Sequence, residues 1–237
     1  MTTDSDRHTH IDDATSDGPV AGAAGKLAGV AVALFALLWL LGLFLVKIVA
    51  ASRLGHDEAT IDTDLAQHRT GWLKSATYWL TQAAQTKTVI AVAVLAVVIL
   101  YAVTRHWHKP VYVAVTLAGE VIIFLLVTLL VHRHRPFDGA PGPTKELDPA
   151  PPTSSFPSGH TAASIAMYGA LAVVLWRANW QRIVRAAAVT LLALIPFAVG
   201  FARVYRGMHF PTDVLGGAVL GIVWLAATTK LLWPVGR

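Results

Sequence analysis

The chain has 237 residues, of which 55% are hydrophobic and only 14% are charged, and its mean hydropathy is +0.56. Soluble proteins carry about a quarter charged residues, so this composition excludes an ordinary soluble enzyme and indicates an integral membrane protein. The net charge of +5 favours anionic lipid over nucleic acid as a partner, and the absence of cysteine excludes disulfides, thiolate metal sites and cysteine nucleophiles.

Residues 1–26 form a polar segment that mixes aspartates with Ser, Thr and Gly and contains almost no large apolar side chain. Such a segment cannot bury enough apolar surface to offset the entropy of ordering, so we expect a disordered tail. His8 and His10 lie within it without further ligands nearby, and we expect no metal site there.

Six apolar stretches follow, each close to the length of about 20 residues that a helix needs to cross the hydrocarbon core. The first runs from Leu27 to Ala50. The others lie at about 84–104, 110–131, 161–176, 183–201 and 214–232. The sequence therefore predicts an all-α protein, a bundle of six transmembrane helices, with residues 27–237 forming one membrane domain.

The connection between the first two spans is long enough to hold structure of its own. Apolar residues recur in it at helical spacing between polar ones: Ile61, Leu65, Trp72, Ala76, Trp79, Leu80 and Ala83. This pattern predicts an outer interfacial helix, with aromatic side chains at headgroup depth. The same stripe could instead pack against the bundle, and the sequence does not decide between these two interpretations.

Lys and Arg flank the spans equally on the two sides of the membrane, so their number alone does not give the orientation. Short loops dominate the positive-inside effect, and several arginines on one side are better explained by chemistry. We therefore expect a multi-pass protein of the inner (plasma) membrane with both termini in the cytoplasm. The loops after the first, third and fifth spans then face outward.

Glu120 lies in the middle of the third span. An ionised carboxylate there costs at least about 2.5 kcal/mol, so we expect Glu120 to face the interior of the bundle. Either a structural role or a role near the lipid headgroup is compatible with the sequence.

Three polar clusters stand at span ends that this topology places on the outer face. They are His132-Arg133-His134-Arg135-Pro136, Ser155-Phe156-Pro157-Ser158-Gly159-His160-Thr161 and the segment from Arg203 to Asp213. A stiff, proline-rich segment joins the first two clusters. The matching inner ends hold mainly Arg, Lys and Trp, so interfacial anchoring does not explain the set, although Arg206 taken singly fits an anchor.

These segments resemble the type 2 phosphatidic acid phosphatase family, membrane lipid phosphatases related in fold to bacterial acid phosphatases and vanadium haloperoxidases. The resemblance covers the chain from the third span onward. The family motif Pro-Ser-Gly-His is intact at 157–160, and the motif Ser-Arg, His and Asp is kept as Arg203, His209 and Asp213, with Ala202 in place of Ser. The first motif keeps Arg135-Pro136 but has Thr128 where the family has Lys.

The chemistry of His209 follows from its spacing to Asp213, which is one helical turn. We expect the carboxylate to hold one ring nitrogen, which leaves the lone pair of the other nitrogen for attack. His209 is thus the predicted nucleophile, and it forms a phosphohistidine. Pro211 suits the first turn of the sixth span.

His160 follows Ser158 and Gly159 at a helix start, where backbone N–H groups bind phosphate oxygens, and we expect it to protonate the leaving oxygen. Arg135, Arg203, Ser158 and Gly159 are the predicted phosphate ligands. Arg133 is a further candidate, because Thr128 leaves the place of the family's Lys without a cation. Fixed arginines can meet the negative charge of a phosphoryl group in transfer, so we expect neither a metal nor a cofactor.

The sequence therefore predicts a membrane lipid phosphatase with an outward-facing site. The resemblance favours undecaprenyl or another polyprenyl diphosphate as the substrate, with phosphatidylglycerophosphate and phosphatidic acid as alternatives. A lipid-binding or transport protein of the same fold without hydrolytic activity is the alternative of another class. The intact His160, His209 and Asp213 argue against it.

Overall fold

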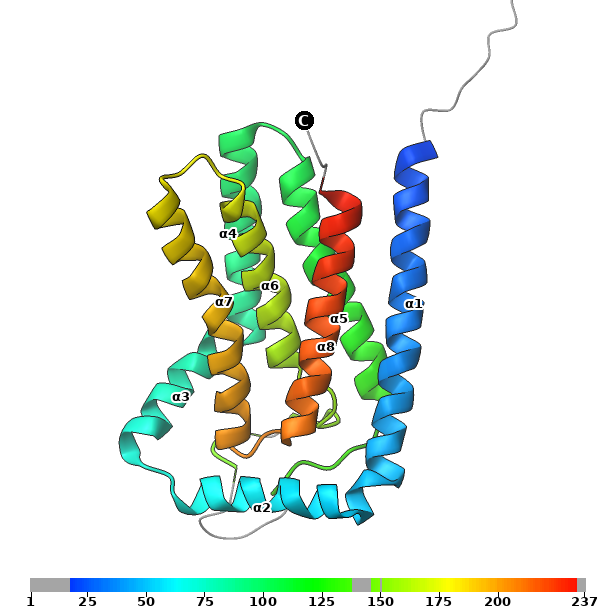
Figure 1. Ribbon diagram of the computed structural model, residues 1–237, viewed down its shortest axis with the longest axis vertical. Helices are drawn as coiled ribbons and strands as arrows, with labels where there is room; N and C mark the ends of the chain where they lie inside the picture. The colour runs from blue at the N-terminus through cyan, green and yellow to red at the C-terminus, as the bar shows by residue number, and fades with distance from the viewer. Residues whose placement is uncertain (1–17, 138–145, 150, 234–237) are drawn as a thin grey trace, which may run out of the picture.

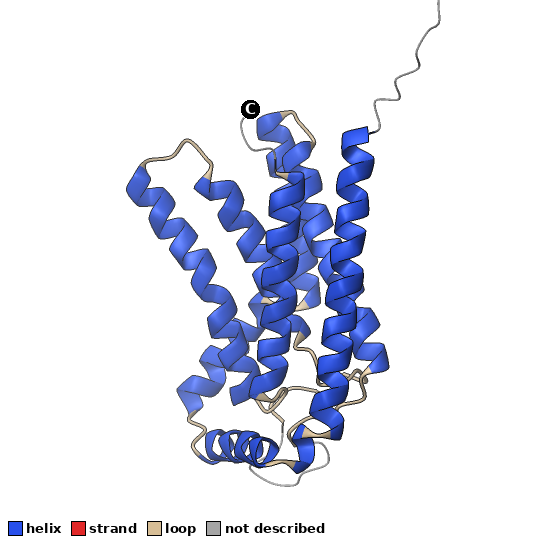
Figure 2. Cartoon of the chain, turned by 45° about the vertical axis from the view of Figure 1, so that its right-hand side comes forward, coloured by secondary structure: helices blue, strands red, loops and turns tan. Residues whose placement is uncertain are grey.

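The computed structural model describes residues 18–137, 146–149 and 151–233. Residues 1–17 of the predicted tail, with His8 and His10, lie outside the described residues, whereas residues 18–26 already belong to the first helix. Every regular element in the described part of the chain is a helix (Figure 2). The predicted all-α fold is confirmed.

Within the described residues, six helices are long and apolar enough to cross a membrane, which confirms the predicted spans. They are α1 (Gly18–Lys47), α4 (Thr86–Thr104), α5 (His108–Leu130), α6 (Gly159–Trp176), α7 (Arg182–Tyr205) and α8 (Pro211–Leu232). The remaining elements are the short 3-10 helix η1 (Val49–Ala51) and two helices between the first two spans, α2 (Arg53–Gln67) and α3 (Gly71–Ala83).

The spans stand side by side, with α6 at the centre in contact with α4, α5, α7 and α8, and with α1 against α5 and α8 (Figure 1). Small side chains let these helices approach closely. Ala162, Ala166 and Ala170 of α6 are fully buried. Gly119 of α5 faces the ring of Trp224 of α8, where a Cβ atom would come within 2.1 Å of a ring carbon.

Glu120 is buried inside this bundle, as predicted, with 1% of its surface exposed. Its Oε2 atom has no hydrogen-bond partner among the described residues. Nearby, the indole of Trp224 donates to the carbonyl of Thr116 at 2.9 Å, which ties α8 to α5. The burial fits the structural role better than a place at the headgroup, because Glu120 lies ten residues before the last residue of α5, Leu130.

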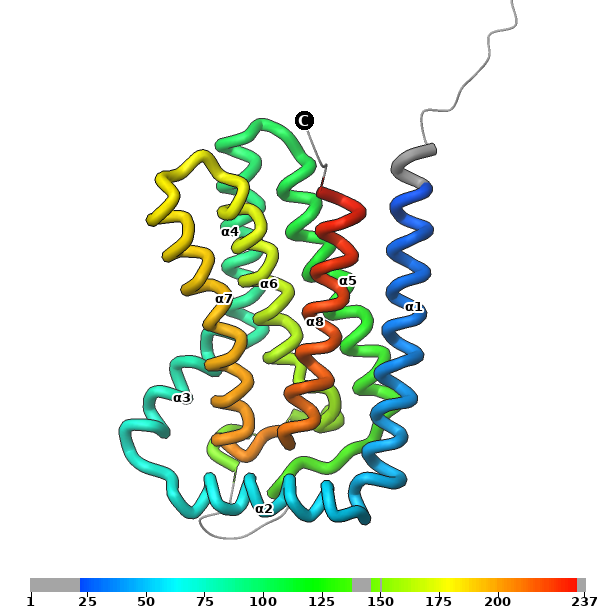
Figure 3. The backbone as a smooth tube through the Cα atoms, in the orientation of Figure 1, coloured from blue at the N-terminus to red at the C-terminus, as the bar shows by residue number. Residues whose placement is uncertain are grey.

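One end of the bundle, here called the site end, collects the last residue of α5, the first of α6, the last of α7 and the first of α8. Figure 3 follows the backbone: the described chain begins and ends at the other end of the bundle, and α2 runs crosswise at the site end. Because the number of spans is even, the described chain begins and ends at the same end of the bundle. The clusters predicted to share one face therefore do share one end of the molecule.

The connection between α1 and α4 holds two helices, where the sequence suggested one. The break falls at His68–Thr70, between α2 and α3. The apolar stripe lies on the molecular surface, with Trp72 70% and Trp79 69% exposed, whereas the buried side chains are mainly polar: Glu58, Asp62, Ala66, Thr77 and Thr81. The exposure of Trp72 and Trp79 favours the interfacial interpretation, but part of the stripe also contacts the bundle, because Leu65, Ala76, Leu80 and Ala83 are partly buried and Ala83 packs against the core.

Candidate active site

The three polar clusters meet at the site end. The first cluster follows α5, the second leads into α6, and the third joins α7 to α8. The backbone connects them as well: the N–H of Ser155 donates to the carbonyl of Arg133 at 2.9 Å, and the N–H of Ser158 donates to the carbonyl of Asp213 at 2.9 Å. The predicted gathering of these residues is what the structure shows.

The ring of His209 is buried, and its orientation is set by a backbone group. Nδ1 lies 2.7 Å from the carbonyl oxygen of Ser155. A carbonyl only accepts hydrogen bonds, so this contact requires the proton on Nδ1 and leaves the lone pair on Nε2. Asp213 was predicted as the direct partner of the ring, but its Oδ2 is 3.8 Å from Nδ1. The predicted tautomer therefore arises from a different acceptor.

Asp213 acts one step further from the ring. Its Oδ2 accepts from the hydroxyl of Ser155 at 2.5 Å and from the backbone N–H of Phe210 at 2.9 Å. The carboxylate thus fixes the residue that holds His209 and also the start of α8, where Pro211 is the first residue as predicted. Asp213 is fully buried, so these hydrogen bonds replace the solvation that the carboxylate has lost.

The electrostatics of the site keep His209 uncharged. Burial holds the pKa of the His209 imidazole well below its ordinary value, and the positive charges of Arg203 and Arg135 act in the same direction. A neutral imidazole is the form that can attack phosphorus. The surroundings of His209 therefore suit a nucleophile at neutral pH.

His160 lies in the first turn of α6, as predicted, and is partly buried. Ser158 immediately precedes this helix, and its hydroxyl accepts from Thr161 at 3.0 Å. The N–H of Gly159 is among those that a helix start leaves without an intrahelical partner. Packing also favours glycine at position 159, because a Cβ atom there would come within 2.8 Å of the Phe124 ring.

The two arginines predicted as phosphate ligands are both buried at the site end. Arg135 donates from Nη1 to the carbonyl of Met208 at 2.6 Å, so it also braces the loop before His209. Arg203 donates from Nη1 to Asp148 at 3.1 Å. Its Nε is buried and has no hydrogen-bond partner among the described residues. A buried donor of this kind is suited to an anionic ligand.

Asp148 was not predicted, and it joins two arginines. Its carboxylate accepts two hydrogen bonds from Arg206, at 2.6 and 2.8 Å, besides the one from Arg203. Burial alone would raise the pKa of Asp148, but the hydrogen bond and charges of Arg206 and the charge of Arg203 outweigh it and lower the pKa. Arg206 is itself buried, so the interpretation of Arg206 as an interfacial anchor is wrong.

Arg133, which was predicted to contact phosphate, forms hydrogen bonds with protein side chains at the site end. Its Nη1 donates to Asp213 at 2.5 Å and to the hydroxyl of Thr212 at 2.7 Å, and its Nη2 donates to Glu58 at 2.9 Å. The guanidinium of Arg133 thus forms ion pairs with two carboxylates, those of Asp213 and Glu58. Thr128, where the family has Lys, is buried, and its hydroxyl lies 3.5 Å from the carbonyl of Ser154.

Glu58 and Asp62 are the other residues that sequence reasoning missed. Glu58 accepts from the N–H of Thr212 at 2.9 Å besides its contact with Arg133. Asp62 follows one turn later on α2, and neither of its carboxylate oxygens has a hydrogen-bond partner in the described part of the chain. Burial raises the pKa of Asp62 to about 8, and the charges of Glu58 and Asp213 add to the effect. The sequence signal for these two residues was weak: Glu58 and Asp62 are four residues apart, which places two carboxylates on one face of an amphipathic helix.

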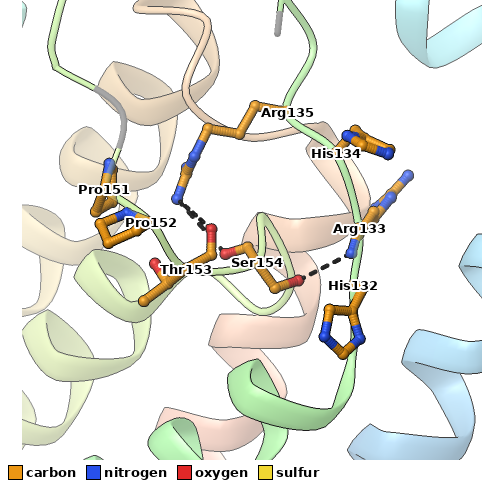
Figure 4. Close-up of a pocket in the computed structure, with 8 residues that line it drawn as sticks. All are labelled: His132, Arg133, His134, Arg135, Pro151, Pro152, Thr153 and Ser154. Carbon is orange, nitrogen blue, oxygen red and sulfur yellow. Dashed lines mark hydrogen bonds between the residues drawn. The ribbon is translucent and has the colours of Figure 1, made fainter.

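An open cavity of about 410 Å³ lies beside this site. Its lining comes from both ends of the proline-rich segment: His132, Arg133, His134, Arg135, Pro151, Pro152, Thr153 and Ser154. In Figure 4 the side chain of Arg135 reaches across to the carbonyls of Thr153 and Ser154, whereas Arg133 projects to the other side. Arg135 therefore belongs both to the cavity wall and to the group around His209. Among the described residues, no group of three or more His, Asp or Glu side chains could hold a metal ion.

Comparison with known proteins gives a family match for residues 109–237, slightly more than half of the chain, to the PAP2 superfamily. Undecaprenyl-diphosphatase BcrC of Bacillus subtilis is 28% identical over 157 residues, which cover 66% of this chain and 73% of that protein. An undecaprenyl-diphosphatase of Sulfolobus acidocaldarius is 32% identical over 128 residues, or 53% of this chain and 55% of that protein.

A solved structure has a similar fold. It is the crystal structure of a transmembrane PAP2 type phosphatidylglycerolphosphate phosphatase from Bacillus subtilis, with a TM-score of 0.73 over 87% of this chain and 98% of that one. The sequence identity is 21%, so this likeness concerns the arrangement of the helices.

Proposed function

The chain belongs to the PAP2 superfamily and is a membrane phosphatase, and from the geometry of its site we propose that it removes the terminal phosphate of a lipid phosphate or diphosphate through a phosphohistidine. We propose undecaprenyl or another polyprenyl diphosphate as the substrate. The family resemblance carried by the three motifs is confirmed by the match over residues 109–237.

The observation that carries this mechanism is the hydrogen bond between Nδ1 of His209 and the carbonyl of Ser155 at 2.7 Å. It leaves Nε2 with a lone pair, in a ring that is neutral. In the first step Nε2 attacks phosphorus in line, the bond from phosphorus to the leaving oxygen breaks, and protonated His160 gives its proton to that oxygen. In the second step water attacks the phosphohistidine, His160 takes a proton from that water, and the P–N bond breaks.

The negative charge of the transferring phosphoryl group needs fixed positive charge around it. Arg203 contributes a guanidinium whose Nε is a buried donor without a partner among the described residues. Arg135, the hydroxyl of Ser158 and the N–H of Gly159 complete the proposed set of phosphate ligands. In this proposal arginines and helix N–H groups stabilise the transferring group, and the reaction needs no metal.

The proposed substrate rests on the two relatives that are named undecaprenyl-diphosphatases. A diphosphate carries more negative charge than a monophosphate ester, and the site end supplies three buried arginines, Arg135, Arg203 and Arg206. We also propose that both termini are cytoplasmic. This end of the bundle then faces outward, because the described chain begins and ends at the opposite end (Figure 3).

Phosphate release from purified protein tests the proposal. The detergent-solubilised protein is supplied with undecaprenyl diphosphate, phosphatidylglycerophosphate or phosphatidic acid, each with and without a chelator. We expect release in chelator, fastest with the diphosphate. Preference for another lipid would reject the substrate. No release from any lipid, with binding retained, would instead indicate a lipid-binding or transport protein.

A further inference from the structure

Glu58 of helix α2 lies outside the three motifs, but its carboxylate contacts the turn that joins His209 to the start of α8. Glu58 Oε1 accepts from the backbone N–H of Thr212 at 2.9 Å, and Oε2 accepts from Nη2 of Arg133 at 2.9 Å. The same guanidinium donates from Nη1 to Asp213 at 2.5 Å. A chain of charged hydrogen bonds thus runs from α2 through Arg133 to the carboxylate that orients His209.

The hydrogen bonds that link Glu58, Arg133 and Asp213 are shielded from water. The side chains of Glu58 and Arg133 are 4% and 7% exposed, and that of Asp213 is fully buried. Burying ions is costly unless their geometry is good and their other hydrogen-bonding groups are also satisfied. Glu58 meets this condition, because each of its oxygens accepts one hydrogen bond.

The contact with Thr212 fixes the start of α8. Thr212 is the second residue of this helix, so its N–H has no acceptor within the helix. Asp213 satisfies the N–H of Phe210 from within the turn, and Glu58 satisfies that of Thr212 from a neighbouring helix. His209 lies one residue before Phe210. Its backbone is therefore held between a contact with α2 and the contact of its ring with Ser155.

Resting on the proposed function, we propose that Glu58 is a positioning residue for phosphoryl transfer, which acts through Arg133 on Asp213 and through Thr212 on the turn that carries His209. It does not touch the phosphate. Its effect is on the rate at which a bound substrate reacts, because a small misplacement of the nucleophile weakens the transition state more than it weakens binding.

The central comparison is Glu58→Gln against Asp57→Asn. Both remove one negative charge from α2, but Asp57 is exposed. In Glu58→Gln the amide oxygen can still accept from Thr212, whereas the NH₂ group faces Arg133 and cannot accept. We expect kcat to fall about 10- to 100-fold, the loss typical of one charge-assisted hydrogen bond, with KM within about twofold of wild type. Asp57→Asn should keep both values.

A double-mutant cycle separates positioning from general stability. If Glu58 acts through Arg133, Glu58→Gln should cost little more kcat in an Arg133→Gln background than Arg133→Gln costs alone. Single-turnover formation of the phosphoenzyme should slow in parallel with kcat. Additive losses, or a rise in KM with unchanged kcat, would overturn the proposal, as would wild-type kcat in Glu58→Gln.

The same measurements distinguish the two proposals. Wild-type protein that releases no phosphate from any lipid defeats the proposed function itself. If Glu58→Gln does not yield folded protein, Glu58→Asp keeps the charge and shortens the side chain by one methylene. A lower kcat at unchanged KM in that variant supports positioning, and wild-type kcat overturns it.

Discussion

At the scale of single residues, the orientation of His209 is indirect. Its ring is held by a backbone carbonyl, the hydroxyl of the same Ser155 is held by Asp213, and Asp213 is held in turn by Arg133. Changes at any of these side chains alter the position of the His209 ring. If His209 is the nucleophile, as proposed, only a change at His209 itself removes the attacking atom.

We therefore expect His209→Ala to abolish turnover while lipid binding survives, since the arginines proposed to bind phosphate remain. Rapid quenching of the wild-type reaction should trap phosphate on the protein that is labile in acid and stable in alkali, and the variant should trap none. Undiminished label on His209→Ala would mean that another residue is the nucleophile.

Asp62 makes the free energy of unfolding depend on pH. Burial raises the pKa of Asp62 from an ordinary value of 3.8 to about 8, the charges of Glu58 and Asp213 act in the same direction, and Arg133 and Arg69 act in the opposite direction. Between these two values the folded state holds a proton that the unfolded chain has released. The free energy of unfolding therefore falls as the pH rises from about 4 to about 8.

Asp62→Asn removes this titration and keeps the shape of the side chain. We expect the Tm difference between the variant and wild type to be larger at pH 9 than at pH 5 by about 10 °C in favour of the variant, measured by thermal unfolding in detergent. Asp64→Asn, at an exposed position of the same helix, is the control. A Tm difference that does not change between the two pH values would show that Asp62 is ionised throughout.

The sequence predicted the side chains of the site better than their partners. His160, His209 and Asp213 stand in motifs whose residue types and spacing carry chemistry, and the structure brings all three to the site end. The acceptor for His209 is a backbone carbonyl, which every residue has, so no sequence pattern marks it. Glu58 is 75 residues from Arg133, and only the folded chain shows that they pair.

At the scale of helices, hydropathy predicts the spans because burial in lipid demands long apolar runs. It does not predict which face of α2 is turned inward. In a soluble protein the apolar stripe would point to the core. Here Glu58 and Asp62 are buried and Ile61 is exposed. Arg133 supplies a charged partner for Glu58, and the membrane supplies apolar surroundings for Ile61.

The crossing of α5 and α8 depends on a residue without a side chain. A Cβ atom at Gly119 would come within 2.1 Å of the Trp224 ring, whereas one at Gly29 of α1 would meet nothing within 4 Å. We expect Gly119→Ala to lower stability by about 1 to 3 kcal/mol through overpacking, and Gly29→Ala to be neutral or slightly stabilising. Thermal unfolding in detergent measures both. Equal Tm values would show that Trp224 can move aside at no cost.

At the scale of the whole molecule, the six spans place the described ends of the chain together and the site at the other end (Figure 1). Counting spans is enough to predict this arrangement. The order of the helices around α6 is set by side-chain shape at each crossing, such as Gly119 against Trp224, and a hydropathy profile does not contain it.

The proposed orientation is testable because the chain has no cysteine of its own. Thr153 lies at the site end, Asn179 lies between α6 and α7 at the opposite end, and both are exposed. Single cysteines at these positions are treated in intact cells with a thiol reagent that does not cross membranes. We expect labelling at 153 and none at 179. The reverse would move the reaction to the cytoplasmic leaflet.

The ion pairs of Asp148 with Arg203 and Arg206 would place a carboxylate in competition with the phosphate that we propose Arg203 binds. If phosphate binds Arg203 as proposed, it would compete with the carboxylate of Asp148 for the Nη1 group of Arg203, and the carboxylate would recover this contact when phosphate leaves. Such competition would weaken the retention of inorganic phosphate after each turnover. We expect Asp148→Asn to lower the inhibition constant for inorganic phosphate about tenfold, the effect of roughly one charge-assisted contact. An unchanged constant would mean that phosphate and Asp148 occupy the arginines together.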